Sequence, residues 1–425
     1  MAADKSFTPA ALTARLVALR AVQGALLIPL LAGLFLLALA GAQSLPNAPI
    51  EKHLAVDTVD FSKDRPYAFN GRKVDMTTEC IGVSYGIGAP EKGAVDRAAR
   101  SPVFLGCPTL LAHLSGAPAA TSDYARYWHG YAVLSRLLLS ALPYHDVRML
   151  IFNAVVLLFF TLGLSLYRKF GLTFAFAVLF PFFFINYAGF MTLITKAVTW
   201  FVALGGAIYF ARAERPYRRD PFIAFFIIGA LTSYLELLTT PLFVFGFCAF
   251  IYFFEFYRRG GGAGPRGDFL RLFLAGGFWA AGYALLWITK FMIAAAVIGP
   301  DLWRDVVETA AFRLNGAYES TKPWFGAATL ENFEVFHVGW GAVVIVVFLI
   351  MPFARPQRRR AALDFARRGP VYVALGLSPY AWFELMSNHS QIHGIFTHAN
   401  LVLFFLPLSL ILFDQTGRAL PQKHA

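Results

Sequence analysis

The sequence has few charged residues and lacks the common motifs of soluble enzymes. Only 15% of its 425 residues are charged, and 25 acidic residues stand against 37 lysines and arginines. It contains no P-loop, no GxSxG nucleophile elbow and no HExxH zinc motif. We also find no cytoplasmic segment long enough to bind ATP or a nucleotide sugar. Any activated donor that this protein uses must therefore reach it within the membrane.

Long polar stretches are scarce, and apolar residues make up 58% of the chain, against about 45–50% in soluble domains. A bilayer core of about 30 Å needs about 20 apolar residues per helix, and continuous apolar runs indicate helices rather than barrel strands. The sequence predicts an all-α integral membrane protein, a single polytopic domain over 1–425 with about ten transmembrane helices. The expected spans are 21–41, 148–166, 171–189, 193–211, 221–238, 240–257, 269–297, 338–354, 370–386 and 399–414. The first is expected to stay as an uncleaved anchor.

Basic residues gather in alternate loops and set the expected orientation. They follow the second, fourth, sixth and eighth expected spans, whereas the loops 186–196, 238–240 and 387–398 contain only Lys196. By the positive-inside rule both termini are cytoplasmic, and we expect a multi-pass membrane protein. The net charge of +12 is explained by this topology and predicts no nucleic-acid partner.

A long polar segment over 43–147 follows the first expected span, and a second polar segment covers 298–337. The first holds ten basic and ten acidic residues and is placed outside the cytoplasm. A transporter rarely needs such a loop, whereas an enzyme that works at the extracytoplasmic surface of its membrane does. Helices expected at 123–142 and 302–314 have the aromatic and polar pattern of the membrane interface. They either cap the bundle or wall a groove where a lipid-linked substrate meets a water-soluble acceptor.

Cysteine is rare, with three residues in the whole chain. Cys80 and Cys107 both lie in the outer loop, where an oxidising compartment permits a disulfide. Such a bridge would stabilise the loop by about 3–4 kcal/mol, and two unpaired thiols are the alternative. Cys248 lies mid-span and is expected to pack as a small apolar residue.

The segment NGRKVDMTTEC at 70–80 is the leading candidate for chemistry. Asp75 and Glu79 are four residues apart, next to Cys80, so a helix would place both carboxylates on one face. A fixed carboxylate suits a general base, and a pair of carboxylates suits a divalent cation. The alternative is a solvated polar loop.

Charged residues inside or at the ends of the spans are further candidates, since they are costly in lipid. Lys290 is flanked by apolar sequence and suits a phosphate headgroup or an ion pair with Glu236. Lys196, at the outer end of a span, is explained by snorkelling to the interface. His389 and His393 have a zinc-compatible spacing but no further local ligands, so we predict no metal site and expect hydrogen bonds to a sugar or phosphate, or plain interfacial polar residues.

This layout resembles the GT-C superfamily of integral-membrane glycosyltransferases, which take sugars from polyprenyl-phosphate carriers. DMTTEC, RYWHGY, YLELLTTP and SNHSQIH look like strings in bacterial membrane proteins of cell-surface glycan loci. Some members of similar size are arabinofuranosyltransferases or modify pilins. The resemblance implies a multi-span bundle in the bacterial inner membrane, a catalytic acidic residue in a long first periplasmic loop, and interfacial helices.

The resemblance also implies roles for single residues. Asp75, or else Glu79, would deprotonate the acceptor in an inverting displacement, with Asp57 and Asp60 as alternatives. The resemblance further implies that Lys290 holds the carrier phosphate and that His389 and His393 line the donor pocket. Arg126 and His129 would lie at the groove. Some members need a divalent cation, Mg or Mn, and others do not, so no cofactor is assigned.

Three functions are therefore compared. The first is a glycosyltransferase that moves a sugar from a polyprenyl-phosphate donor to a cell-envelope glycan, lipid or protein acceptor, with its active site in the periplasm. The second is a transporter or flippase of lipid-linked sugars that uses Glu236 and Lys290 along its path. The third is a scaffold without catalytic activity.

Overall fold

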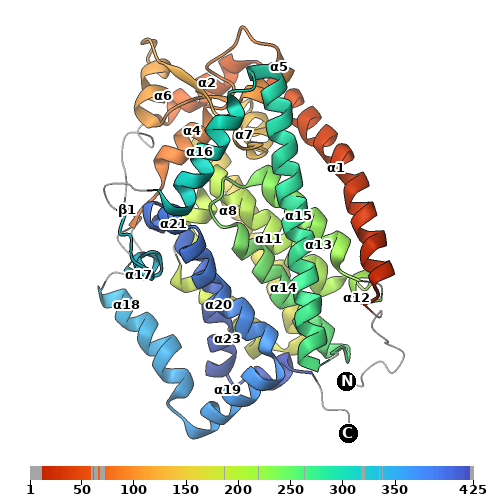
Figure 1. Cartoon of the computed structure of the whole chain (residues 1–425). Helices are drawn as coiled ribbons and strands as arrows, with labels where there is room; N and C mark the ends of the chain where they lie inside the picture. The colour runs from red at the N-terminus through yellow and green to blue at the C-terminus, as the bar shows by residue number, and fades with distance from the viewer. Residues whose placement is uncertain are drawn as a thin grey trace.

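The protein is a bundle of helices with a smaller, mixed region at one end (Figure 1). The computed structural model describes residues 12–58, 61, 66–67, 72–185, 187–218, 220–262, 264–316, 321–334, 336 and 338–421. Six described helical segments are long and apolar enough to cross a membrane, or seven if one bent pair counts as a span. The six are α1 (Ala14–Gln43), α8 (Tyr144–Phe170), α11 (Ile194–Arg212), α14 (Pro241–Arg258), α15 (Gly264–Ile298) and the segment Gly394–Leu412.

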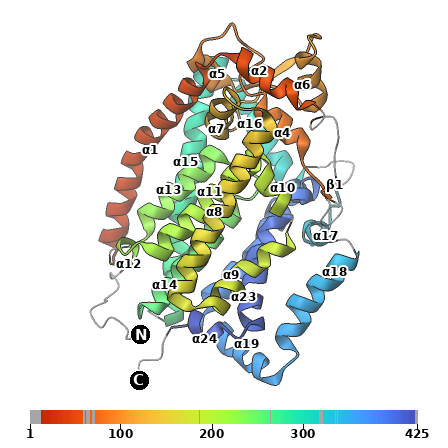
Figure 2. The same cartoon turned by 180° about the vertical axis from the view of Figure 1, so that it is seen from behind.

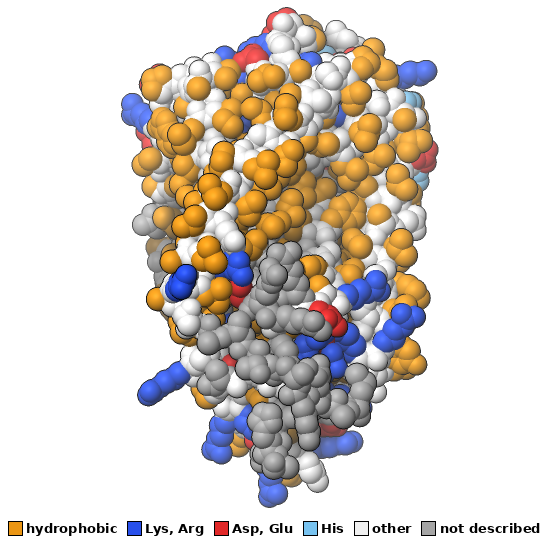
Figure 3. Space-filling model, turned by 90° about the vertical axis from the view of Figure 1, so that its right-hand side faces the viewer, with side chains coloured by type: hydrophobic (Ala, Val, Ile, Leu, Met, Phe, Trp, Pro, Cys, Tyr) orange, Lys and Arg blue, Asp and Glu red, His pale blue; other side chains and the backbone are white. Residues whose placement is uncertain are grey.

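These helices form two groups by their surroundings. Most of α11, α14 and Gly394–Leu412 is buried inside the bundle, whereas α1, α8 and α15 leave most of their apolar surface exposed. Hydrophobic side chains cover much of one face between the two ends of the molecule, and Lys and Arg gather toward the lower end (Figure 3). An apolar outer surface of this extent is what a lipid-facing bundle requires.

By length and composition, six or seven crossings are supported among the described residues, and the ten expected are not confirmed. The segment expected at 171–189 is broken into α9 (Leu172–Leu179), η1 (Phe180–Phe184) and α10 (Tyr187–Thr192). Pro181 lies at the start of η1 and lacks an N–H donor for a continuous helix. Those expected at 221–238 and 370–386 form α13 (Phe222–Leu235) and α20 (Pro370–Leu385), of 14 and 16 residues, which are shorter than about 20.

The bent pair lies near the C-terminal part of the chain. Here α18 (Val338–Val344), η2 (Ile345–Ile350) and η3 (Met351–Phe353) lead into α19 (Pro356–Arg368). The two arms meet at 88°. The remaining helical segments are α12 (Arg215–Arg218), α21 (Ser387–Ile392), α22 (Gly394–Thr397), η4 (His398–Leu401), α23 (Val402–Leu412) and α24 (Thr416–Ala419).

The end of the bundle that contains residues 43–143 is called the loop end from here on. It holds the short helices α2 (Asn47–Val56), α4 (Met76–Val83), α5 (Ala94–Arg100), α6 (Cys107–Leu114) and α7 (Tyr131–Leu139). Two antiparallel pairs accompany them: β1 (Pro66–Tyr67) with β2 (Arg72–Lys73), and β3 (Pro102–Phe104) with β4 (Thr121–Asp123). From the other half of the chain α16 (Leu302–Asn315) joins them, whereas α17 (Ala327–Glu334) lies lower and packs against α20 and α21 (Figures 1 and 2).

A disulfide and a buried arginine hold the loop end together. The sulfur atoms of Cys80 and Cys107 are 2.01 Å apart, which confirms the expected pair and joins α4 to α6. The Arg136 guanidinium is fully buried and donates to the carbonyls of Ala42, Tyr85 and Leu45 and to the Asn47 side chain. The helix expected over 123–142 is shorter, because 121–123 pairs as a strand and only 131–139 is helical. The helix expected at 302–314 is present as α16.

Candidate functional site

A buried ion pair joins the loop end to the membrane helices. Asp75 caps the N-terminus of α4, and its Oδ1 accepts from the Thr78 backbone N–H at 3.1 Å. Its Oδ2 lies 3.1 Å from Nζ of Lys196, in the first turn of α11. Lys196 is only 2% exposed, and its ammonium stands 3.9 Å from the centre of the Phe396 ring. A chain segment of the loop and a membrane helix are thus linked by opposite charges.

The environment of Asp75 keeps it ionised. Burial raises the pKa of its carboxyl, but the Lys196 ammonium and the hydrogen bond from Thr78 outweigh this, so the pKa lies below its ordinary value. Beside the pair lies a small hollow of about 10 Å³, which is roughly the space that one water molecule needs. Apart from the ion pair, neither Asp75 Oδ2 nor Lys196 Nζ has a hydrogen-bond partner among the described residues.

Arg313, near the end of α16, lies against two histidines. Its Nη1 is 3.2 Å from Nδ1 of His389 and 2.7 Å from Nε2 of His393. Nε2 of His389 lies 2.7 Å from the Leu238 carbonyl, which can only accept, so this nitrogen carries the proton and Nδ1 accepts from Arg313. Burial and the charges of Arg313 and Lys196 lower the pKa of His393 to about 3, and burial, His393 and Arg313 lower that of His389 well below its usual range. Both rings are therefore neutral acceptors for the guanidinium.

Glu236 completes the group. It follows the last residue of α13, is 1% exposed, and its Oε1 accepts from the Thr240 N–H at 2.5 Å and from the Thr239 hydroxyl. Lys196 is close enough for its charge to act on this carboxylate. Leu238, with φ of +62°, aims its carbonyl at His389. We call Asp75, Lys196, Glu236, Arg313, His389 and His393 the loop-end cluster.

Several buried polar atoms in and beside the loop-end cluster lack a partner. Within the described part of the chain no hydrogen bond reaches Oε2 of Glu236, Nε of Arg313 or Oδ1 of Asn388. Asn388 adjoins His389 and donates to the Phe312 carbonyl, next to Arg313. Because buried polar atoms are almost always hydrogen-bonded, unpaired atoms gathered at one place favour a polar ligand there.

Arg126 contacts α16, the helix that carries Arg313 of the loop-end cluster. It donates to the Thr309 hydroxyl at 2.7 Å, lies 4.0 Å from the Asp305 carboxylate, and stacks over the Tyr124 ring at 5.1 Å. The charges of Arg126, Arg313 and Asp75 all act on Tyr124, whose pKa is raised by burial. Arg126 therefore lies at the rim, where α16 meets the loop end.

Four other predicted residues already have hydrogen-bond partners within the protein. Glu79 is 0% exposed and accepts from the Tyr144 hydroxyl, from the N–H groups of Ile194 and Thr195, and from the Thr195 hydroxyl, at 2.6–3.1 Å. These contacts cap the N-terminus of α11. Asp57 accepts from the N–H of His145 at 2.8 Å and so caps α8.

Lys290 and His129 also have hydrogen-bond partners within the protein. Lys290 is 1% exposed and donates to the carbonyls of Ala98 and Ala99 at 2.9 and 2.6 Å, at the C-terminal end of α5. His129 is bonded through one ring nitrogen to the Tyr131 hydroxyl and through the other to the Tyr124 carbonyl. Asp60 lies outside the described residues.

Two members of the cluster were not expected from the sequence. Lys196 was explained by snorkelling, and Arg313 was one polar residue of an interfacial helix. The signal for Lys196 was that it is the single cation in the short loops 186–196, 238–240 and 387–398. Arg313 had no such signal, since its histidine partners lie 76 and 80 residues away.

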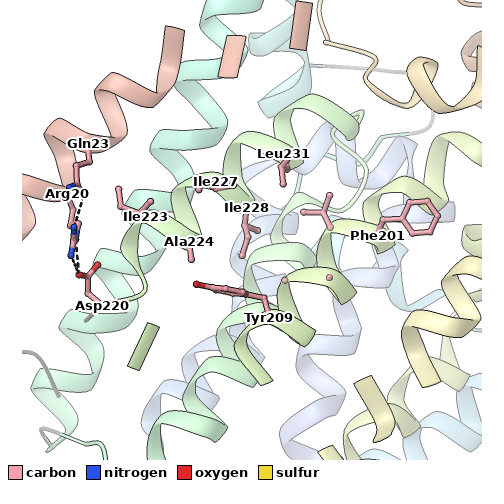
Figure 4. Close-up of a pocket in the computed structure, with 13 residues that line it drawn as sticks. Arg20, Gln23, Phe201, Tyr209, Asp220, Ile223, Ala224, Ile227, Ile228 and Leu231 are labelled. Carbon is pink, nitrogen blue, oxygen red and sulfur yellow. Dashed lines mark hydrogen bonds and ion pairs between the residues drawn. The ribbon is translucent and has the colours of Figure 1, made fainter. Parts of the chain in front are cut away.

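A larger hollow lies elsewhere in the bundle. A cavity of about 490 Å³ opens between α1, α11 and α13, and none of the loop-end cluster lines it. Its walls are mainly apolar, with Ile223, Ile227 and Leu231 on α13, and its charged residues Arg20 and Asp220 pair with each other at 2.8 Å (Figure 4). We therefore place the candidate chemistry at the loop-end cluster.

Comparisons with protein-family models, curated proteins and solved structures found no match. Among the described residues, no group of three or more His, Cys, Asp or Glu side chains is arranged to hold a metal ion.

Proposed function

We propose that this protein is a membrane glycosyltransferase of the bacterial inner membrane. It would move a sugar from a polyprenyl-phosphate donor to a cell-envelope glycan, lipid or protein acceptor on the extracytoplasmic side, which we identify with the loop end. The observation that supports this most is one cluster with an ionised carboxylate, Asp75, a buried cation, Lys196, a half-buried cation, Arg313, and several buried polar atoms that have no hydrogen-bond partner among the described residues. The GT-C-like layout agrees with the proposal but does not identify the reaction by itself.

The loop-end cluster suits a displacement at the anomeric carbon. The acceptor oxygen forms a bond to that carbon while the bond to the phosphate oxygen breaks, and the bonding electrons leave with the phosphate. Asp75 takes the proton of the acceptor hydroxyl as general base. The phosphodiester becomes a monoester and gains negative charge, so cations beside it stabilise the transition state more than the ground state.

Asp75 fits the role of base better than the other predicted carboxylates. The four hydrogen bonds of Glu79 and the helix cap at Asp57 occupy those groups. Asp75 keeps one oxygen that is bound only by an ion pair, next to a small hollow.

Arg313 and Lys196 are the groups we assign to the carrier phosphate. A guanidinium presents several N–H donors in a fixed plane and suits phosphate oxygens, and an ammonium adds a point charge. Lys290, the first choice on sequence grounds, already donates to two backbone carbonyls. His389 and His393, neutral and bonded to Arg313, would orient the guanidinium and line the donor pocket, with Arg126 at its rim.

Mass spectrometry of lipids retained by the protein in mild detergent tests the proposal. We expect a polyprenyl-phosphoryl monosaccharide, whose mass would separate pentose from hexose, and its loss in Arg313→Gln but not in Lys290→Met. The purified protein should then transfer that sugar, and Asp75→Asn should not. Retention of a polyprenyl diphosphate oligosaccharide without transfer would favour the transporter, and bulk phospholipid alone would reject the assignment of the cluster to a carrier phosphate.

A further inference from the structure

The amphipathic helix α19 lies across the end of the bundle opposite the loop end. Its axis makes 88° with the preceding arm, and both views place it at the lower end of the molecule (Figures 1 and 2). Its sequence, PQRRRAALDFARR, puts arginines on the surface while Phe365 is buried. A helix that turns through about a right angle at the end of an apolar arm, with basic and apolar faces, has the geometry of one lying in the membrane interface.

The arginines of α19 and its N-cap fall into two groups. Arg358 pairs with Asp414, Arg368 pairs with Asp364, and Arg359 donates to the Phe353 carbonyl at 2.6 Å, at the bend. The second group, Arg355, Arg360 and Arg367, is exposed and has no ion-pair or hydrogen-bond partner in the described part of the chain. Among the described residues, three positive charges thus have no partner on this helix and its N-cap.

A groove runs along α19, and Arg359 is the arginine of this helix that lines it. It has a volume of about 450 Å³ and lies between α19, α20 and α23, lined among others by Ala362, Leu363, Ala366, Leu377, Phe404 and Leu408. Among its described lining residues Arg359 alone is charged. Its size lies within the range of about 300–1,000 Å³ that is usual for small-molecule sites.

We propose that this groove and the free arginines of α19 form a binding site for one anionic glycerophospholipid. An acyl chain would lie among Leu363, Ala366 and Leu377, and the phosphate would meet Arg359 at the rim and the unpaired arginines beside it. Charge complementarity favours this occupant, because a neutral lipid or a second copy of this basic face would leave the three charges unpaired. The positive-inside rule explains arginines anywhere in this segment, but not a groove of this size along the helix.

Native mass spectrometry of the full-length protein tests the proposal, with phosphatidylglycerol as the probe and phosphatidylcholine of the same acyl chains as the neutral reference. We expect the protein to bind phosphatidylglycerol in preference. The triple variant Arg355→Gln/Arg360→Gln/Arg367→Gln should weaken this binding about 100-fold, at about fivefold for each arginine removed near an anionic headgroup. The matched control Lys52→Gln/Lys92→Gln/Arg304→Gln removes the same charge from the loop end and should leave the affinity unchanged.

A second variant separates the groove from simple surface attraction. Ala366→Phe keeps every charge and fills the groove, so it should also weaken binding of phosphatidylglycerol, at least tenfold. Equal binding of the two lipids, an equal fall in both triple variants, or full affinity in Ala366→Phe would each overturn the proposal. These readouts do not use sugar transfer, so they are independent of the function proposed for the loop-end cluster.

Discussion

The ion pair between Asp75 and Lys196 makes the most direct prediction about stability and activity. Asp75→Asn keeps an oxygen that caps α4, since asparagine is as good an N-cap as aspartate, but removes the charge that faces Lys196. Lys196 is almost fully buried, and its ammonium has no other carboxylate within ion-pair distance among the described residues. Removing one partner of such a pair costs about 3–5 kcal/mol. Because Asp75 retains some exposure, we expect a loss of about 3 kcal/mol.

The double variant Asp75→Asn/Lys196→Met distinguishes a structural from a catalytic role. In the double variant no charge is left buried without its partner, the asparagine oxygen still caps α4, and a methionine still packs on the Phe396 ring. The double variant should therefore be more stable than the sum of the single variants predicts, by at least about 2 kcal/mol. Sugar transfer should stay absent in the double variant, because its base is missing.

Thermal unfolding in detergent measures the first part of this prediction. With an unfolding entropy of about 2.1 cal/mol/K per residue, a loss of 3 kcal/mol lowers the midpoint by about 3 °C for a chain of this length. Additive losses in the double variant would show that the pair is not energetically coupled. Transfer by Asp75→Asn at the wild-type rate would show that Asp75 is not the base, whatever its effect on stability.

Three further predictions follow from contacts of the described residues. Glu79→Gln disturbs the cap of α11 and should cost about 2–3 kcal/mol in thermal unfolding; transfer lost at unchanged stability would instead make Glu79 catalytic. Burial lowers the pKa values of His389 and His393, so the unfolded state binds more protons than the folded state below about pH 6.5. As the pH is lowered from about 6.5, the free energy of unfolding should therefore fall by up to about 1.4 kcal/mol per pH unit for each histidine, and the contribution of His393 should level off near pH 3. A double His→Gln variant that kept this acid dependence would refute the assignment. Cys80→Ala/Cys107→Ala opens a loop of 27 residues and should lower the free energy of unfolding by about 3–4 kcal/mol. A reductant should destabilise the wild-type protein and leave the stability of this variant unchanged.

The sequence predicted the all-helical bundle, the cysteine pair and the helix α16, because each depends on a strong local signal. Continuous apolar runs have few alternatives to helices in lipid, and two cysteines in one outer loop have few alternatives to each other. The number of membrane crossings was harder to predict from the sequence. A run such as that of α13 is as apolar as a membrane span, and only the structure shows that its helix has 14 residues. Hydropathy does not separate a short buried helix from a crossing.

Asp75, Glu236 and the two histidines stand out in the sequence as polar residues in unusual places, and the fold brings them together in the loop-end cluster. The sequence could not show the contacts of a residue whose partners lie far away along the chain. Lys290 looked like a free cation, but its acceptors, Ala98 and Ala99, lie about 190 residues earlier in the chain. Arg313 looked like a surface residue of an amphipathic helix, and only the fold brings it to His389 and His393.

The arrangement of the loop-end cluster links donor binding to the strength of the base. In the structure Lys196 holds the pKa of Asp75 below its ordinary value, which makes this carboxylate a weak acceptor of protons. A carrier phosphate beside Lys196 would share its charge, so that Asp75 would lose part of the interaction that stabilises its ionised form. Under the proposed function the pKa of Asp75 would then rise toward the working pH only when the donor is present, and a general base is most effective in that range. An ion pair that looks purely structural in the free protein is in this way consistent with a catalytic role for its carboxylate.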